Sequence, residues 1–132
     1  EAAKAAGAKR AIPLTVAGAY HSPLMEPAKV GLAEALSRVD LNSQNVPVFS
    51  NVTGQMHDSA ETIAGTMVDQ VTSPVKWEAC IRAMIEDGIT RFIELGPGSA
   101  LTGFMRRIDR EVEILSISDV NSLTKTVELL NT

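Results

Sequence analysis

The fold class is decided by the stretch TRFIELGPGSALTGFMRRI, which spans residues 90–108. Residues 90–95 predict a strand, and the Gly-Pro-Gly that follows at residues 96–98 predicts a tight turn. After the turn, the apolar residues Leu101, Phe104 and Ile108 recur at the spacing of a helix. A strand, a short turn and a helix in this order form the repeating unit of a parallel α/β sheet.

The same alternation continues on both sides of this stretch. Downstream, residues 112–117 predict a strand, and residues 123–130 keep the apolar spacing of a helix. Upstream, an apolar stripe over residues 60–71 predicts a helix that ends near Gln70. We therefore expect a parallel sheet that is covered by helices on both faces.

A cap residue and a proline predict the start of one more helix. Ser73 is a good helix cap, and Pro74 suits a first helical position, where a missing N–H costs nothing. The apolar stripe over residues 77–85 continues this helix until Gly88 closes it.

The first third of the chain predicts shorter elements. Residues 1–6 resemble the last turns of a helix that Gly7 ends. Residues 12–16 and 46–50 predict strands, and residues 27–39 predict a helix between them. Because the chain begins at Glu1 in helical composition, we expect it to be a piece of something longer.

Composition excludes several classes of function. The 132 residues carry 12 Lys and Arg against 16 Asp and Glu, a net charge of -4, and no basic run exceeds Arg106-Arg107. We therefore expect no nucleic-acid partner. Every apolar run is shorter than the roughly 18 residues of a membrane span, so no membrane partner is expected either. The single Cys80 permits no internal disulfide and suits a reducing cytoplasm.

Ligands of α/β sheets usually bind at loops that follow strands, here residues 17–23, 51–59 and 96–99. His21 lies in the first of these loops, where an imidazole could act as a general base because its pKa lies near neutrality. On position alone, a solvated loop histidine is the more common case. His57, in the second loop, is the weaker candidate.

Three other features favour structural interpretations. The turn at residues 96–98 resembles an anion cradle, but Leu101 stands where the dinucleotide fingerprint needs glycine, so a tight turn is preferred. Cys80 falls on an apolar helix stripe, which favours packing over nucleophilic chemistry. His21, His57 and Cys80 do not make a metal-ligand set, so no metal site is predicted. Because no G-x-S-x-G elbow occurs, the residues offer a base without a nucleophile.

Three separated motifs resemble the malonyl-CoA:acyl carrier protein transacylases. They are VAGAYHSPLM at residues 16–25, QVTSPVKW at residues 70–77, and ELGPG at residues 94–98 followed by LTG and RRI. The resemblance covers essentially the whole chain but only the C-terminal part of the family. It implies the end of a ferredoxin-like inserted subdomain in residues 1–17, as a closing helix and strand. Residues 18–132 would be the second half of the large, hydrolase-like α/β subdomain.

The resemblance also implies an activity. These enzymes transfer malonyl from malonyl-CoA to the phosphopantetheine thiol of acyl carrier protein in fatty acid biosynthesis, by a serine-histidine ping-pong mechanism. No cofactor is bound, and the coenzyme A thioester is a substrate. His21 matches the catalytic histidine, and Gln70 matches the glutamine whose main-chain carbonyl orients it. Tyr20 matches a substrate-binding position where a bulky ring favours malonyl over branched acyl groups.

The family's GHSxG nucleophile, its malonyl-binding arginine and its oxyanion-hole glutamine have no counterpart in these 132 residues. We therefore expect the chain to be inactive alone and to need the missing N-terminal part of the enzyme as a partner. Two alternatives stay open. One is a non-catalytic module that binds acyl carrier protein or coenzyme A, and the other is an acyltransferase domain fragment of a polyketide or fatty acid synthase.

Overall fold

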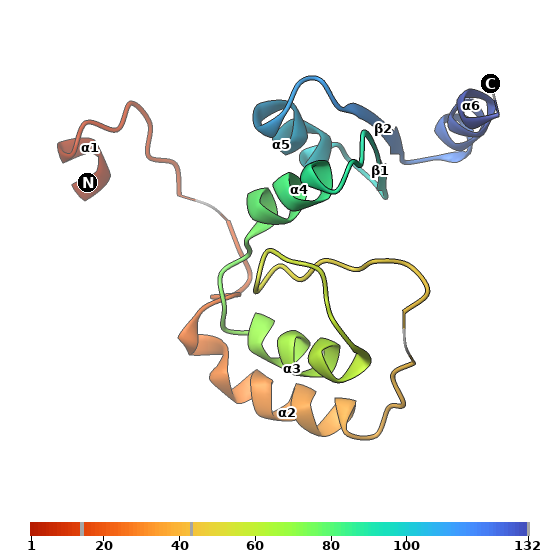
Figure 1. Cartoon of the computed structure of the whole chain (residues 1–132). Helices are drawn as coiled ribbons and strands as arrows, with labels where there is room; N and C mark the ends of the chain where they lie inside the picture. Colours follow the sequence, from red (N-terminus) through yellow and green to blue (C-terminus); the bar gives the residue numbers. More distant parts are fainter. Residues whose placement is uncertain (14, 43, 132) are drawn as a thin grey trace.

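The computed structural model describes residues 1–13, 15–42 and 44–131. Its elements are α1 (Ala2–Ala5), a 3-10 helix (Pro23–Met25), α2 (Glu26–Leu36), α3 (Ala60–Gln70), α4 (Trp77–Glu86), β1 (Arg91–Leu95), α5 (Ala100–Ile108), β2 (Glu113–Ile117) and α6 (Val120–Leu130). Within the described ranges, none of the helices is long and apolar enough to cross a membrane. Figure 1 shows α1 on an extended arm, apart from the other elements.

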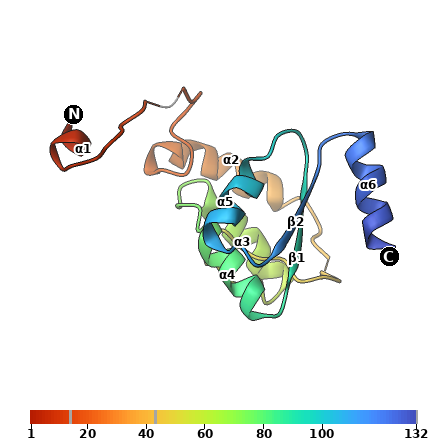
Figure 2. The same ribbon diagram turned by 90° about the horizontal axis from the view of Figure 1, so that it is seen from above.

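The two strands form a small parallel sheet. β1 pairs with β2 so that Arg91 lies opposite Glu113 and Leu95 lies opposite Ile117. The side chains of Arg91 and Glu113 also form an ion pair across the strands. Helices α4 and α5 lie on one side of the sheet and α6 on the other (Figures 1 and 2). This confirms the predicted α/β class, with parallel strands and helices on both faces.

The buried apolar core is small and comes from α4 and α5. Its members are Cys80, Ile81 and Met105, each at most 3% exposed. The loop before α3 also contacts α4, because a Cβ at Gly54 would lie 2.7 Å from the Cβ of Ala79. Gly54 has φ +78°, so the close approach and the backbone conformation both require glycine there.

Helices α2 and α3 pack side by side as a second layer (Figure 1). An ion pair joins them, with 3.0 Å between Lys29 Nζ and Asp69 Oδ1. This hydrogen bond from Lys29 to Asp69 raises the pKa of the lysine. The Ser59 side chain caps the first turn of α3 by accepting a hydrogen bond from the Thr62 amide. The last residue of this helix, Gln70, is the predicted one.

The two strands predicted in the first half of the chain are wrong. Of residues 12–16, Leu14 lies outside the described residues, and the others belong to no strand. In residues 46–50 the only pairing among described residues is one antiparallel bridge from Phe49 to Met56. Here the amide of Ser50 donates to the nearby Gln55 oxygen, so the segment bonds within its own loop instead of joining the sheet. Alternating apolar residues predict an exposed and a buried face, but a strand also needs a neighbouring strand.

The helix that was predicted to begin at Ser73-Pro74 begins instead at Trp77, with Lys76 as its cap. The segment before it is held by residues outside the helix. Lys76 donates its amide to the Asn51 oxygen at 2.8 Å, which keeps that amide out of helical geometry. Gly88, with φ +90°, closes the helix as predicted. The other predicted helices are also present: α1 ends before Gly7, α2 begins one residue earlier and ends three residues earlier than predicted, α5 follows the Gly-Pro-Gly turn, and α6 begins three residues before the predicted apolar stripe.

Candidate active site

The loop between the N-terminal arm and α2 holds His21 in a constrained conformation. His21 has φ +58°, and it is the only described residue besides glycines with a positive φ. Such a backbone is rare outside glycine and clusters at functional sites. The Ser22 hydroxyl donates to the Ala19 oxygen at 2.6 Å and closes the turn that contains His21. The 3-10 helix at Pro23–Met25 then leads the chain directly into α2.

The last residue of α3 meets this histidine. The Nδ1 atom of His21 lies 2.8 Å from the main-chain oxygen of Gln70, although the residues are 49 positions apart. Because the α3 helix ends at Gln70, this carbonyl has no intrahelical partner and is free to accept from the imidazole. This is the contact that the resemblance implies.

The contact determines which ring nitrogen carries the proton. A carbonyl only accepts hydrogen bonds, so a bond at 2.8 Å requires a proton on Nδ1. The Gln70 side-chain nitrogen lies farther from the same atom, at 3.4 Å. In a neutral imidazole, a proton on Nδ1 leaves Nε2 unprotonated. The exposed Nε2 of His21 can therefore accept a proton from a group that approaches from solvent.

The Gln70 side chain has a different role from its main chain. Its Nε2 donates to the Ser73 oxygen at 3.0 Å and reaches the Pro74 oxygen at 3.5 Å. The amide side chain thus stabilises the turn that connects α3 to α4. It contributes less to the orientation of His21 than the carbonyl does.

Tyr20 lies directly before the histidine, with its side chain directed to the solvent side. The residue is 61% exposed. A Cβ at Gly18 would lie 3.4 Å from the Tyr20 ring, so the ring rests against the bare backbone of that glycine. The ring is therefore held against Gly18 without being buried.

After the turn at residues 96–98, the first amides of α5 bind a carboxylate of the same chain. The carboxylate of Glu94 accepts hydrogen bonds from the Leu101 amide at 3.1 Å, the Thr102 amide at 2.9 Å and the Thr102 hydroxyl at 2.6 Å. These bonds, the Thr102 hydroxyl first, hold the pKa of Glu94 below its ordinary value. A side chain of the same chain occupies the α5 N-terminus, and the structural interpretation of the turn is confirmed.

Cys80 and His57 lie away from this constellation. Cys80 is 3% exposed, and burial raises the pKa of its thiol, which confirms the packing role. The thiol donates to the Ser50 oxygen at 3.3 Å. His57 is half-buried and contacts Thr66, with 3.4 Å between Nδ1 and Oγ1. In the part of the chain that the structure describes, no three His, Cys, Asp or Glu side chains gather where they could hold a metal ion.

Two features of the site carry no signal in residue spacing. The positive φ of His21 depends on the closed turn around it, and the Glu94 bonds depend on how β1 and α5 meet. An acidic residue two positions before Gly96, at the end of a strand that leads into a helix, is the one clue that could have indicated the second feature.

No family model matches this chain. The malonyl CoA-acyl carrier protein transacylase of Bacillus subtilis is 39% identical over 130 residues, which are 98% of this chain and 41% of the relative. The Escherichia coli K12 protein of the same name is 35% identical over 128 residues, again 41% of its length. The chain therefore spans about two fifths of the length of these relatives.

Solved structures agree. The malonyl CoA-acyl carrier protein transacylase of Clostridium perfringens superposes with a TM-score of 0.90 at 37% identity. The superposition covers 98% of this chain and 40% of the Clostridium perfringens chain. A malonyl-transacylase solved in complex with a type II PKS acyl-carrier protein superposes with a TM-score of 0.91 at 38% identity. In that case 97% of this chain matches 41% of the other.

Proposed function

We propose that this chain, a homologue of part of the malonyl CoA-acyl carrier protein transacylases, supplies the general base for malonyl transfer. The acyl donor would be malonyl-CoA and the acceptor the phosphopantetheine thiol of acyl carrier protein, in fatty acid biosynthesis. The observation that carries this proposal is the 2.8 Å contact between His21 Nδ1 and the Gln70 carbonyl. It leaves Nε2 of the exposed imidazole as a proton acceptor.

The first half-reaction loads a serine that this chain does not carry. Nε2 of His21 accepts the proton of the serine hydroxyl while the serine oxygen attacks the thioester carbonyl of malonyl-CoA. The resulting imidazolium is stabilised by its Nδ1–H bond to the Gln70 oxygen. Collapse breaks the carbon–sulfur bond, His21 returns its proton to the coenzyme A thiolate, and a malonyl-serine ester remains.

The second half-reaction reverses these roles. His21 accepts the proton of the phosphopantetheine thiol, and the thiolate attacks the ester carbonyl. The serine oxygen leaves and takes the proton from Nε2, which restores the free enzyme. In this scheme Tyr20 contacts the acyl group, and its position next to His21 supports that assignment.

We further propose the division of the chain that the resemblance implies, with residues 1–17 in a small subdomain and residues 18–132 in the large one. The separation of α1 and its arm from the other elements supports this division (Figure 1). We place the reaction in the cytoplasm, because the one cysteine is a free, buried thiol that needs no oxidising compartment.

The test uses the chain with a source of the serine. About three fifths of the Bacillus subtilis transacylase have no match in this chain, and we call that polypeptide the remainder. The complemented enzyme is this chain co-expressed with the remainder. Malonyl transfer from malonyl-CoA to acyl carrier protein is measured for the complemented enzyme and for its His21→Ala and His57→Ala variants. We expect His21→Ala to lower kcat roughly 10²- to 10⁴-fold. The matched control His57→Ala should stay within threefold of the parent, and a His21→Ala variant that transfers malonyl at the parent rate would refute the proposal.

A further inference from the structure

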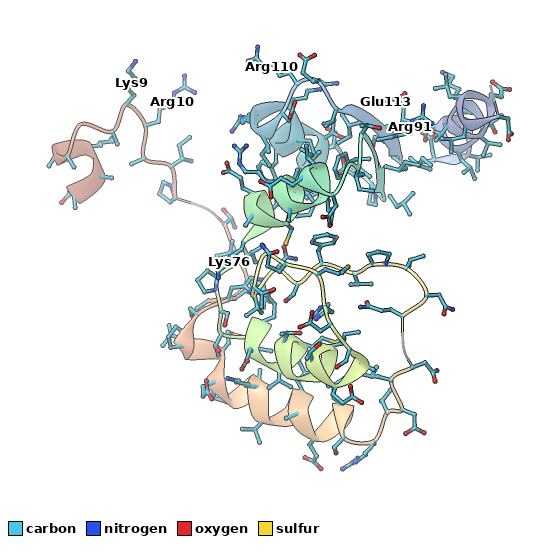
Figure 3. The ribbon with its side chains drawn as sticks, viewed as in Figure 1. Lys9, Arg10, Lys76, Arg91, Arg110 and Glu113 are labelled. Atoms are coloured by element: carbon cyan, nitrogen blue, oxygen red, sulfur yellow. The ribbon has the colours of Figure 1, made fainter. Side chains whose placement is uncertain are left out.

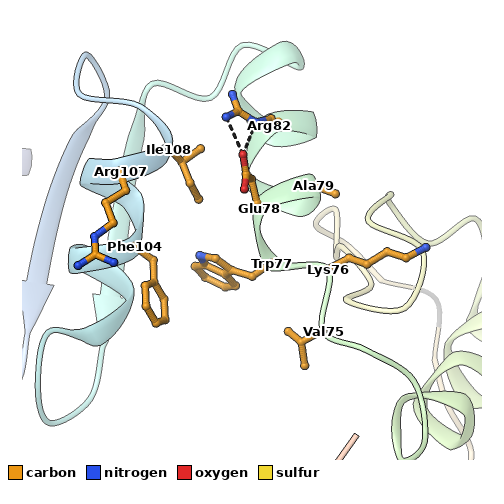
Figure 4. Close-up of a pocket in the computed structure, with 9 residues that line it drawn as sticks. All are labelled: Val75, Lys76, Trp77, Glu78, Ala79, Arg82, Phe104, Arg107 and Ile108. Carbon is orange, nitrogen blue, oxygen red and sulfur yellow. Dashed lines mark hydrogen bonds and ion pairs between the residues drawn. The ribbon is translucent and has the colours of Figure 1, made fainter. Parts of the chain in front are cut away.

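Four ion pairs lie within the described residues, and one of them joins two helices. Lys29 on α2 pairs with Asp69 on α3, with 3.0 Å between Lys29 Nζ and Asp69 Oδ1. The others are Glu34–Arg38 at the end of α2, Glu78–Arg82 within α4 (Figure 4) and Arg91–Glu113 across the two strands (Figure 3). Among these four, the Lys29–Asp69 pair is therefore the one that constrains how two helices lie.

The charges of this pair oppose the dipoles of their own helices. Lys29 is the fourth residue of α2, near the N-terminus, where a negative side chain is favoured. Asp69 is the next-to-last residue of α3, near the C-terminus, where a positive side chain is favoured, and the last turn of α3 has no basic residue. Each charge alone would destabilise its own helix. The pairing between the helices offsets this cost, so the two residues suit a contact between helices better than either suits its own helix.

The rest of the contact between α2 and α3 is loosely packed. Neither helix has a buried residue among those described. A groove of about 410 Å³ is lined by residues of both helices, including Ala33, Gly65 and Asp69 itself. Interdigitated apolar side chains usually fix the position of one helix on another. Because such packing is sparse between the described parts of α2 and α3, the ion pair has a larger share in fixing their relative position.

Both ends of the pair lie close in the chain to the contact between His21 and Gln70. Asp69 directly precedes Gln70, so their Cα atoms are about 3.8 Å apart. The main-chain oxygen of Asp69 also accepts from the Ser73 amide at 3.0 Å, which fixes the turn after α3. On the other side, the 3-10 helix at Pro23–Met25 leads from the His21 turn into α2 without an intervening loop. A shift of α2 along α3 would therefore move the imidazole relative to the carbonyl.

We infer that Lys29 and Asp69 are positioning residues that hold the His21 imidazole at the Gln70 carbonyl. This inference rests on the proposed function, in which that contact leaves Nε2 of His21 as the base. The two residues act through the imidazole and the carbonyl, and not on the substrate. Misplacing a catalytic group by about 1 Å can cost roughly 100-fold in rate. The side chains of Lys29 and Asp69 are 26% and 55% exposed, and a partly exposed ion pair shifts an equilibrium by about fivefold at most, so we expect a smaller loss.

A pair that only stabilises the fold is the competing interpretation. Breaking such a pair would lower the Tm. At a temperature well below the Tm it would leave both kcat and the position of the proton on His21 unchanged. The test therefore measures these two quantities.

The kinetic test uses the complemented enzyme well below its Tm. Lys29→Met and Asp69→Asn each remove one charge and keep a side chain of similar size. We expect each to lower kcat roughly three- to fivefold and to change KM for malonyl-CoA less than about twofold. Lys29→Asp combined with Asp69→Lys exchanges the charges and should return kcat to within about twofold of the parent. The matched control is Glu34→Gln, which breaks the ion pair with Arg38 at the end of the same helix and should keep the parent kcat.

A spectroscopic test does not depend on malonyl transfer. With the chain labelled with ¹⁵N in the complemented enzyme, the imidazole ¹⁵N shifts of His21 report the ratio of its Nδ1-protonated to its Nε2-protonated form. This ratio should fall at least about threefold in Lys29→Met and stay unchanged in Glu34→Gln.

Either of two results would overturn the inference: parent kcat in both single variants, or no recovery of kcat when the charges are exchanged. A His21→Ala variant that transfers malonyl at the parent rate would instead refute the proposed function. In that case the ¹⁵N ratio alone decides whether the Lys29–Asp69 pair positions His21, and an unchanged ratio in Lys29→Met would show that it does not.

Discussion

The main-chain oxygen of Gln70 lies 2.8 Å from Nδ1 of His21 and joins the end of α3 to a loop 49 residues earlier in the chain. A carbonyl acceptor at this distance requires a proton on Nδ1. Because α3 ends at Gln70, the oxygen of this residue has no helical partner and can accept from His21.

Replacing the Gln70 side chain should have a modest effect. Gln70→Ala keeps the main-chain oxygen that accepts from His21 and removes the side-chain bond to the Ser73 oxygen. Because one neutral hydrogen bond contributes about 1 kcal/mol, kcat of the complemented enzyme should stay within roughly tenfold of the parent. Steady-state transfer assays check this. A loss as large as that of His21→Ala would mean that the side chain, and not the carbonyl, orients the base.

The Ser22 hydroxyl should matter through the backbone of His21. Ser22→Ala removes the 2.6 Å bond to the Ala19 oxygen and loosens the turn that holds His21 at φ +58°. We expect kcat to fall roughly tenfold, since misplacing a catalytic group is costly, while KM for malonyl-CoA changes less than twofold. Ser22→Thr keeps a hydroxyl and should restore most of kcat. Equal kcat for the Ala variant and the parent would remove Ser22 from the account.

Tyr20 should control the size of the acyl group. Tyr20→Ser removes a large ring from the residue that directly precedes His21, which should leave room for a branched methyl group. In the complemented enzyme, the ratio of kcat/KM for methylmalonyl-CoA to that for malonyl-CoA should rise roughly 10- to 100-fold. Tyr20→Phe keeps the ring and is the matched control, with a ratio near that of the parent. An unchanged ratio in Tyr20→Ser would count against the role of this residue.

Glu94 should make the fold sensitive to acid. Its pKa is lowered in the folded chain by the Thr102 hydroxyl and by the amides of Thr102 and Leu101, so its ionised form stabilises the folded state. That contribution is present above the ordinary carboxyl pKa of 4.5 and is lost as pH falls through the lower folded pKa. At pH 7, the Tm of Glu94→Gln should be a few degrees lower than that of the parent. At acid pH the two Tm values should lie closer together, because Glu94 of the parent is then protonated and no longer stabilises the fold. A Tm difference that does not depend on pH would contradict this, and Glu111→Gln on an exposed loop is the control.

How much could be predicted from the sequence differs between helices and strands. The helix over residues 60–70 was predicted to its last residue, because a continuous apolar stripe acts locally. The strands at residues 91–95 and 113–117 were also predicted, since each is followed by a turn and a helix. Residues 46–50 alternate in the same way, yet they bond to residues 55–57 of their own loop. A periodic pattern does not identify a pairing partner, which the rest of the fold determines.

In the candidate site, too, local features could be predicted from the sequence, whereas contacts between distant residues could not. His21 was recognised as a candidate base from its residue type and loop, but its partner Gln70 came only from the resemblance, because no local rule connects residues 49 positions apart. The φ of +58° at His21 and the carboxylate of Glu94 at the α5 N-terminus became visible only in three dimensions. The first depends on the closed turn around His21, and the second depends on how β1 and α5 meet.

The proton position on His21 tests the central claim most directly. The chain is labelled with ¹⁵N and combined with the unlabelled remainder, so that only its two histidines are observed, and His57→Ala assigns the signals. At pH 8, above the ordinary range of histidine titration, two-bond ¹⁵N–¹H spectra distinguish a protonated from an unprotonated ring nitrogen. We predict a proton on Nδ1 of His21 and a bare Nε2. A proton on Nε2, with Nδ1 bare, would contradict the role of the Gln70 carbonyl and the assignment of Nε2 as the base.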